Sequence, residues 1–145
     1  MDVRYLNRHE TRNQKGRDAE NRALEWFLLH RRARLLIRNY RRRYGEIDLI
    51  FEEEVLDSSD SWGSRNSNQN FHAQELVFVE VRLRLPGGLV DGPESLDWKK
   101  QRSLQRAAER FLWKYRGKAR TIRFDLLSWD GTAWTHLQGI RLGES

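Results

Sequence analysis

The chain has 145 residues, of which 27 are basic and 21 acidic, a net charge of +6, and no cysteine. This length suits one domain with its own core, and we expect a single domain over residues 1–145. The missing cysteines exclude disulfides, thiolate nucleophiles and cysteine-bound zinc. No apolar run approaches the ~20 residues of a membrane span, and no signal-peptide core is present. We therefore expect a soluble cytoplasmic protein without a membrane partner.

The charge is distributed unevenly along the chain. Residues 52–75 contain six acidic residues and one basic residue, so the rest holds 26 basic and 15 acidic residues, a net charge of +11. Lysine and arginine contacts to phosphates release counterions, so a body this basic predicts a nucleic-acid partner. A solvated basic surface without a partner is the alternative.

The first predicted helix follows an arm without periodicity at residues 1–14, which we expect to be mobile. An apolar stripe with a spacing of four residues predicts a helix over residues 15–32. Glu20 lies near the edge of this stripe. It is either a functional carboxylate or a surface residue favoured by the helix dipole.

A short apolar run at residues 35–37 predicts the first strand, and an arginine triplet between two tyrosines follows it. Surfaces that combine arginine and aromatic residues hold phosphates and stack bases. We therefore interpret the triplet as a nucleic-acid contact, with a solvated turn as the alternative. The five residues are Tyr40, Arg41, Arg42, Arg43 and Tyr44.

Two further strands are predicted over residues 45–51 and 76–84. Because side chains alternate between faces, pairing of the two strands would bring Asp48, Glu80 and Arg82 to one side of the sheet. Arg84 shares the face of Glu80. The opposite face of the first strand is predicted to hold Ile47, Leu49 and Phe51.

Two carboxylates this close repel unless a positive charge lies between them. Mg²⁺ prefers such hard oxygen ligands and keeps several waters for phosphates. With a basic side chain beside it, such an ion would complete a site that cleaves phosphodiesters. A structural salt bridge between Glu80 and Arg82 explains the same residues without any metal.

Between these strands, residues 52–75 form an acidic segment rich in serine and asparagine, which predicts a long mobile loop inserted in the central hairpin. A second helix is predicted over residues 97–115, with Asp97 as its cap. Two strands joined by a turn at Asp130-Gly131 end the chain. Arg123 and Asp125 share one strand face, where we expect a structural ion pair. The four histidines have no metal-ligand spacing and are interpreted as structural.

The sequence resembles the YraN-like or UPF0102 family of small uncharacterised bacterial proteins, which is similar to archaeal Holliday-junction resolvases. The resemblance rests on Gly45-Glu46-Ile47-Asp48-Leu49-Ile50 and Phe78-Val79-Glu80-Val81-Arg82-Leu83-Arg84. It extends to Gly16-Arg17-Asp18-Ala19-Glu20, Arg38-Asn39-Tyr40-Arg41, Lys100-Gln101-Arg102 and Arg123-Phe124-Asp125. Several short motifs in this order are far more specific than any one of them.

The resemblance implies an α/β fold with a restriction-endonuclease-like core, in which two main helices flank a central mixed sheet. Element order alone fits an α+β sandwich equally well. Nucleases of this type carry Asp, then Glu-x-Lys, often with a helical Glu. The implied catalytic residues are Glu20, Asp48, Glu80 and Arg82, and the first three would bind Mg²⁺ or Mn²⁺.

The departure from the nuclease pattern is Arg82, which stands where that pattern has lysine. Arginine stays protonated and cannot act as a base, although it can clamp a phosphate. A nucleic-acid-binding protein without turnover is therefore the alternative to a nuclease. Lys100 and Gln101 match the family pattern and are candidate nucleic-acid contacts. Resolvases pair because junctions are symmetric, so a homodimer is compatible with the resemblance.

Overall fold

The computed structural model describes residues 12–56, 72–84 and 96–143. Its elements are α1 (Arg12–His30), β1 (Ala33–Arg42), β2 (Gly45–Leu56), β3 (His72–Leu83), α2 (Trp98–Lys114), β4 (Thr121–Trp129) and β5 (Trp134–Leu137). The strands form one sheet in chain order, in which β3 and β4 are parallel and the other neighbours are antiparallel. The prediction of an α/β protein with a mixed sheet and two helices is confirmed.

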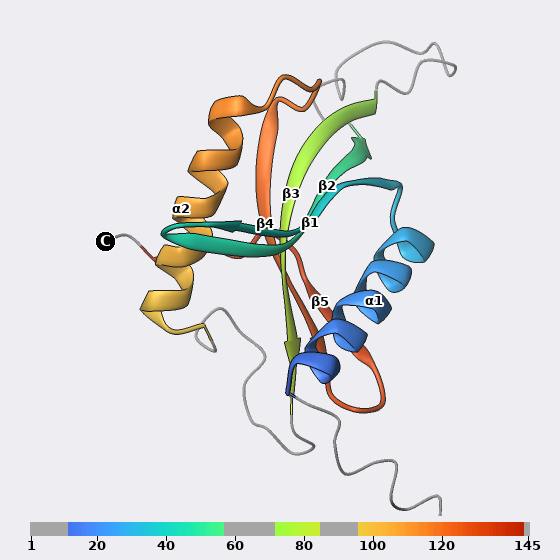
Figure 1. Ribbon diagram of the computed structural model, residues 1–145. Coiled ribbons are helices and arrows are strands. Elements are labelled where there is room, and N and C mark those ends of the chain that lie inside the picture. The colour runs from blue at the N-terminus through green and yellow to red at the C-terminus, as the bar shows by residue number, and fades with distance from the viewer. Residues whose placement is uncertain (1–11, 57–71, 85–95, 144–145) are drawn as a thin grey trace, which may run out of the picture.

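The two helices cover opposite faces of the sheet (Figure 1). On one face, Ala23 and Phe27 of α1 pack on a cluster of buried residues from β2, β3 and β4. On the other, Leu104 and Ala108 of α2 belong to a second buried cluster with side chains from all of the first four strands. Each strand of the central hairpin therefore alternates between two dry faces, which explains its high content of Val, Ile, Leu and Phe.

β2 leaves β3 near its own N-terminus. Its pairing with β3 begins at Leu49 opposite Val79, whereas its pairing with β1 extends to Gly45. The turn between β1 and β2 swings over α2 as a result (Figure 1). Any side chain at position 45 would collide with α2, because a Cβ there would lie 2.1 Å from the carbonyl oxygen of Ser103.

This divergence corrects the predicted faces of β2. Ile47 packs with Ile50 in the cluster beneath α2, while Leu49 and Phe51 pack in the cluster beneath α1. The prediction that Ile47 shares a face with Leu49 and Phe51 was therefore wrong. The partner strand β1 is irregular at this point, because Asn39 is left-handed with φ 54° and lies between the partners of Leu49 and Ile47. Such irregularities increase the local twist of a strand pair.

Several element boundaries differ from the sequence prediction. α1 begins at Arg12, so residues 12–14 of the expected arm are helical. The strands of the central hairpin extend into the expected loop, as far as Leu56 and again from His72. Residues 1–11 and 57–71, with the rest of that arm and loop, lie outside the described residues. Asp97 caps α2 as predicted, since its carboxylate accepts the amide of Lys100 at 2.8 Å.

The predicted ion pair of Arg123 and Asp125 is confirmed, with 2.7 Å between Nε and Oδ1. Asp125 also bonds His136, whose Nε2 lies 2.7 Å from Oδ2. Arg123 additionally contacts Glu53, which is 2% exposed and also bonds Arg31. Burial is compensated here by several partners for each charge, as a stable buried ion pair requires. Among the described helices, none is long and apolar enough to cross a membrane.

Candidate active site

Three carboxyl groups from three elements come together where β2 leaves β3: Glu20 of α1, Asp48 of β2 and Glu80 of β3. The carboxyl groups of Asp48 and Glu80 lie within hydrogen-bonding reach of each other. Glu20 is close enough to Asp48 for the two charges to repel. The structure thus brings together the three carboxylates singled out in the sequence, one from a helix and two from neighbouring strands.

Asp48 is held in place by the backbone of β3. Its Oδ2 accepts the amide N–H of Val81 at 2.8 Å. At this point β3 has lost its ladder partner on the β2 side, and an unpaired buried amide is costly. The aspartate side chain substitutes for the missing strand, which fixes its carboxylate beside Glu80.

Glu20 and Glu80 each leave one buried oxygen without a partner. Within the described part of the chain, Oε2 of Glu20 and Oε2 of Glu80 accept no hydrogen bond. Glu80 is only 5% exposed. Because nearly all buried polar atoms in folded proteins are paired, two orphaned oxygens beside one aspartate indicate a missing donor or cation.

The electrostatics of the site agree with this geometry. Burial, followed by the charge of Asp48, raises the pKa of Glu80 to about 8. Burial also raises the pKa of Asp48, against the hydrogen bond from Val81. For Glu20, burial and the nearby Asp48 raise the pKa, while a hydrogen bond from Asn39 opposes the rise. A raised pKa in all three carboxyl groups is expected where burial and mutual repulsion act on one acidic cluster.

Lys100 is the cation that the structure places against these carboxylates. Its Nζ lies 3.3 Å from Oε1 of Glu80 and 3.2 Å from Oε1 of Glu46. Burial lowers the pKa of Lys100, but the charges of Glu80, Asp48 and Glu46 outweigh it and the pKa is raised. At pH 7 the ammonium therefore donates to a Glu80 carboxyl that is mostly protonated, and the contact becomes a full ion pair above about pH 8.

The position of Lys100 follows from topology. A helix that connects two parallel strands starts near the carboxyl end of the first strand, and α2 follows β3 in this way. Lys100 lies in the first turn of α2, so it reaches Glu80 near the carboxyl end of β3. The sequence indicated Lys100 as a nucleic-acid contact that could point towards the site, and the structure brings its ammonium against Glu80.

The other predicted contacts occupy different places. Arg82 lies half-buried two residues beyond Glu80, opposite Ser128 of β4. The backbone amide of Arg84 donates to Trp129. The amide group of Gln101 is bonded at both ends within the protein, to the carbonyl of Leu96 at 2.8 Å and the amide of Gly143 at 2.6 Å.

The arginine triplet lies at the turn between β1 and β2, exposed to solvent. Nε of Arg41 is 3.8 Å from Oε2 of Glu46, which also contacts Lys100. Arg42 and Arg43 lie over the rings of Tyr40 and Tyr44, at 4.3 Å and 5.2 Å from the ring centroids. Glu46 thus connects the arginine turn with the carboxylate cluster.

Asn39 is the site residue that sequence reasoning missed. Its backbone is left-handed, and its side chain hydrogen-bonds Glu20. Asparagine tolerates this conformation better than most residues, and such outliers gather at functional sites. An asparagine inside an otherwise extended run of β1 was the available signal.

The donor set is incomplete as a preformed metal centre. In the described ranges, no three carboxylate, imidazole or thiolate groups are arranged to hold one metal ion. The inner pair, Asp48 and Glu80, is the closest approach to such an arrangement. Mg²⁺ in proteins often takes only one or two carboxylates and fills its remaining positions with water and phosphate oxygens.

The raised pKa of Glu80 predicts how the stability of the metal-free protein depends on pH. The folded state retains a proton that the unfolded chain releases, so the free energy of unfolding should fall as pH rises from 4.5 to about 8. Above that pH the loss in free energy of unfolding is complete. It amounts to about a few kcal/mol, which is the shift in the pKa of Glu80 converted to free energy. Urea unfolding in EDTA across this range measures it.

Glu80→Gln should remove this part of the pH dependence and stabilise the metal-free protein at pH 8. Glu25→Gln, an exposed position on α1, is the matched control and should leave the profile unchanged. Subtracting one profile from another isolates Glu80 from the other titrating groups. Parallel profiles for wild type and Glu80→Gln would show that Glu80 has an ordinary pKa.

Fold and site together define the class of protein. It is an α/β protein with a five-stranded mixed sheet, and it has an acidic cluster beside Lys100 where β2 separates from β3. The model of the uncharacterised protein family UPF0102 matches residues 19–128. The UPF0102 protein of Nitrosospira multiformis is 35% identical over 127 residues, covering 88% of this chain and 89% of that protein. The relative from Pseudomonas putida is 38% identical over 118 residues, covering 81% and 80%. The chain belongs to the UPF0102 family.

Proposed function

We propose that the protein is a metal-dependent nuclease with a restriction-endonuclease-like core, which cleaves phosphodiester bonds in DNA or RNA. The observation that carries the proposal is the pair of orphaned, buried oxygens on Glu20 and Glu80 beside Asp48. A buried carboxylate oxygen without a donor is costly to fold, and a bound cation would satisfy it.

The residues present fit Mg²⁺ or Mn²⁺. All available donors are carboxylate oxygens, the ligands that these hard cations prefer. Asp48 and Glu80 would hold the ion, with Glu20 as a further ligand or outer contact. When bound, the ion would polarise the scissile phosphate and activate water.

The remaining roles follow from the positions of the side chains. Val81 and Lys100 orient the two inner carboxylates, so that neither needs to reorganise on binding. The ammonium of Lys100 would offset the charge that develops on the phosphate, which is the task that lysine performs in the Glu-x-Lys pattern. Arg82 would clamp a phosphate with its planar fork.

A nucleic-acid-binding protein without turnover is the second candidate, and Arg82 in place of lysine favours it. Such a protein keeps the basic surface but has no use for a cation among buried carboxylates. Metal binding therefore separates the two functions independently of substrate choice.

We expect titration calorimetry to detect a Mn²⁺ site in the wild-type protein. Its affinity should rise with pH towards about 8, because Glu80 must lose its proton to bind metal. Asp48→Asn should weaken the affinity at least tenfold, on the order of the loss caused by removing even an outer partner of a metal ligand.

Glu25→Gln removes an exposed carboxylate from α1 and should bind Mn²⁺ like the wild type. Equal affinity of the wild type and Asp48→Asn would contradict the assigned ligands. Absence of any Mn²⁺ binding would favour the protein without turnover.

A further inference from the structure

We propose that a groove between the β1–β2 turn and α2 binds single-stranded nucleic acid, stacking unpaired bases on Tyr44 and Trp113 and holding phosphates with arginines. The inference rests on the proposed function, because it names the form of nucleic acid that the same protein takes. We call this cavity the arginine groove. It is lined chiefly by Arg42, Arg43, Tyr44, Arg106, Arg110 and Trp113, and its volume is about 580 Å³.

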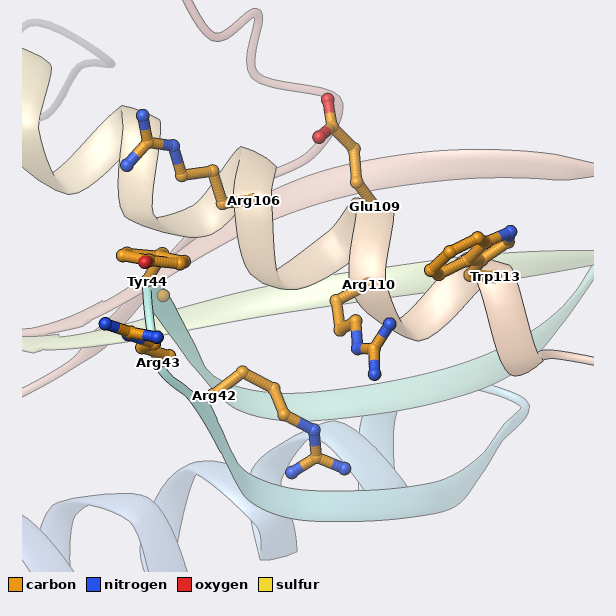
Figure 2. Close-up of a pocket in the computed structure, with 8 residues that line it drawn as sticks. Arg42, Arg43, Tyr44, Arg106, Glu109, Arg110 and Trp113 are labelled. Atoms are coloured by element: carbon orange, nitrogen blue, oxygen red, sulfur yellow. The ribbon is translucent and has the colours of Figure 1, made fainter.

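The β1–β2 turn and α2 line the groove from its two sides (Figure 2). The two elements pack closely at Gly45. Arg106, Arg110 and Trp113 follow one another at four- and three-residue spacing, so they line one side of α2. Figure 2 shows the side chain of Arg110 reaching from α2 towards the hairpin, while Glu109 points to the other side of the helix. One wall is a helix and the other is a strand turn, and the close approach of Gly45 to Ser103 leaves no room for a side chain between them.

The charge of the groove is unbalanced. Among the described residues that line it, four are arginines and one, Glu109, is acidic. None of these four arginines forms an ion pair with a carboxylate in the part of the chain that the structure describes. Guanidinium groups gathered without counter-charges repel, and phosphate oxygens match their planar fork.

The two rings lie open to solvent. Tyr44 is 62% exposed and Trp113 is 74% exposed. Guanidinium groups lie near both, Arg106 at 5.8 Å from the centroid of Tyr44 and Arg110 at 5.3 Å from that of Trp113. Exposed aromatics next to arginines form the platform on which bases of single strands stack.

Single strands fit this surface better than a duplex does. In a duplex the bases are already stacked and paired, so their faces are inaccessible to Tyr44 and Trp113. An unpaired strand exposes those faces and its phosphates together. The groove also adjoins the carboxylate cluster, since Gly45 lines it and the next residue, Glu46, contacts Lys100. A strand lying in the groove would therefore pass beside the site proposed to cut it.

The test is fluorescence anisotropy in EDTA at low salt, with labelled oligo-dT, oligo-U and a DNA duplex. We expect both single strands to bind more tightly than the duplex. Trp113→Ala should weaken single-strand binding about 5- to 150-fold, the equivalent of the ~1–3 kcal/mol that one stacked base contributes. Arg110→Gln should reduce the salt dependence of log K by about 0.7, as expected for one phosphate contact.

Two matched controls keep the test specific. Trp98 lies on the same helix, is 65% exposed and is outside the groove, so Trp98→Ala should bind like the wild type. Arg22 is an exposed arginine of α1, and Arg22→Gln should keep the wild-type salt dependence. Both groove substitutions replace surface residues, and thermal unfolding will verify that the variants remain folded.

The outcomes separate this inference from the nuclease proposal, because binding is measured without metal. Loss of single-strand affinity in Trp113→Ala but not in Trp98→Ala supports the groove even if the protein cuts nothing. Unchanged affinity in Trp113→Ala and Arg110→Gln would overturn the inference even if the protein is a nuclease. Equal losses in the variants and their controls, or tighter binding of the duplex, would overturn it too. Oligo-dT and oligo-U together distinguish DNA from RNA as the source of the strand.

Discussion

Asp48→Asn is expected to reduce Mg²⁺-dependent cleavage by at least about a hundredfold, the upper end of the effect of losing an outer partner of a metal ligand. The change removes a carboxylate between Glu20 and Glu80 but keeps an oxygen that can accept the amide of Val81. Metal affinity should therefore fall while β2 stays attached to β3. Initial rates at saturating substrate, with Mg²⁺ varied, measure the effect.

The stability of Asp48→Asn separates a lost ligand from a lost fold. Burial raises the pKa of Asp48, so the neutral amide should fold at least as well as the acid in EDTA. An inactive variant that is as stable as the wild type would support the assignment. An unfolded variant would require Asp48→Glu instead, which keeps the charge and displaces it. Full activity in a folded Asp48→Asn protein would rule out Asp48 as a metal ligand.

Lys100→Met should lower the cleavage rate about 10²- to 10³-fold, the range seen when one preorganised electrostatic contact to the transition state is removed. Methionine retains the length and apolar body of the side chain, so the change removes mainly the ammonium beside Glu80. Mn²⁺ affinity should change far less than the rate, because Lys100 is not a ligand. Rate and affinity measured on the same preparation test this division.

Lys99 is the natural control for Lys100. It is the preceding residue of α2, carries the same charge, is exposed, and lies beside the ring of Trp98. Lys99→Met should cleave at nearly the wild-type rate. Adding Arg82→Lys to Lys100→Met should restore part of the activity if a lysine on β3 can take over the same task. Equal loss of activity in Lys99→Met and Lys100→Met would mean that only general basicity matters.

The site could be predicted in part because strands impose a strict alternation. Val77 and Val79 lie on one face, so Phe78 and Glu80 lie on the other, and the structure confirms this. The turn at Asp130-Gly131 was also predicted from the sequence, and in the structure Gly131 has φ 97° between β4 and β5. Patterns of this kind depend only on neighbours in sequence.

The remaining parts of the site depend on tertiary structure. Ile47 changes face because β2 leaves β3 and follows the twisted strand β1, which no pattern within β2 reveals. Lys100 reaches Glu80 across the crossover from β3 to α2. Asn39 meets Glu20 only because α1 packs over the sheet. Sequence reasoning recognised Glu80 but could not determine which cation would lie next to it.

The site also illustrates how function can oppose stability. Burial of Glu80 lowers the free energy of unfolding increasingly as the pH rises towards about 8, and the raised pKa of Glu80 reflects this loss. The arginines of the groove add further like-charge repulsion. Both features are expected where a protein retains charges for a ligand rather than for its own fold.

The most direct test of the central claim is a cleavage assay with the full chain in Mg²⁺, Mn²⁺ and EDTA. Substrates should include single-stranded DNA, duplex DNA, a four-way DNA junction and structured RNA, with Asp48→Asn purified in parallel. We expect cutting that needs the metal and disappears in the variant. Binding without cutting in either metal, or cutting that persists in Asp48→Asn, would contradict the assignment of this carboxylate cluster as a nuclease active site.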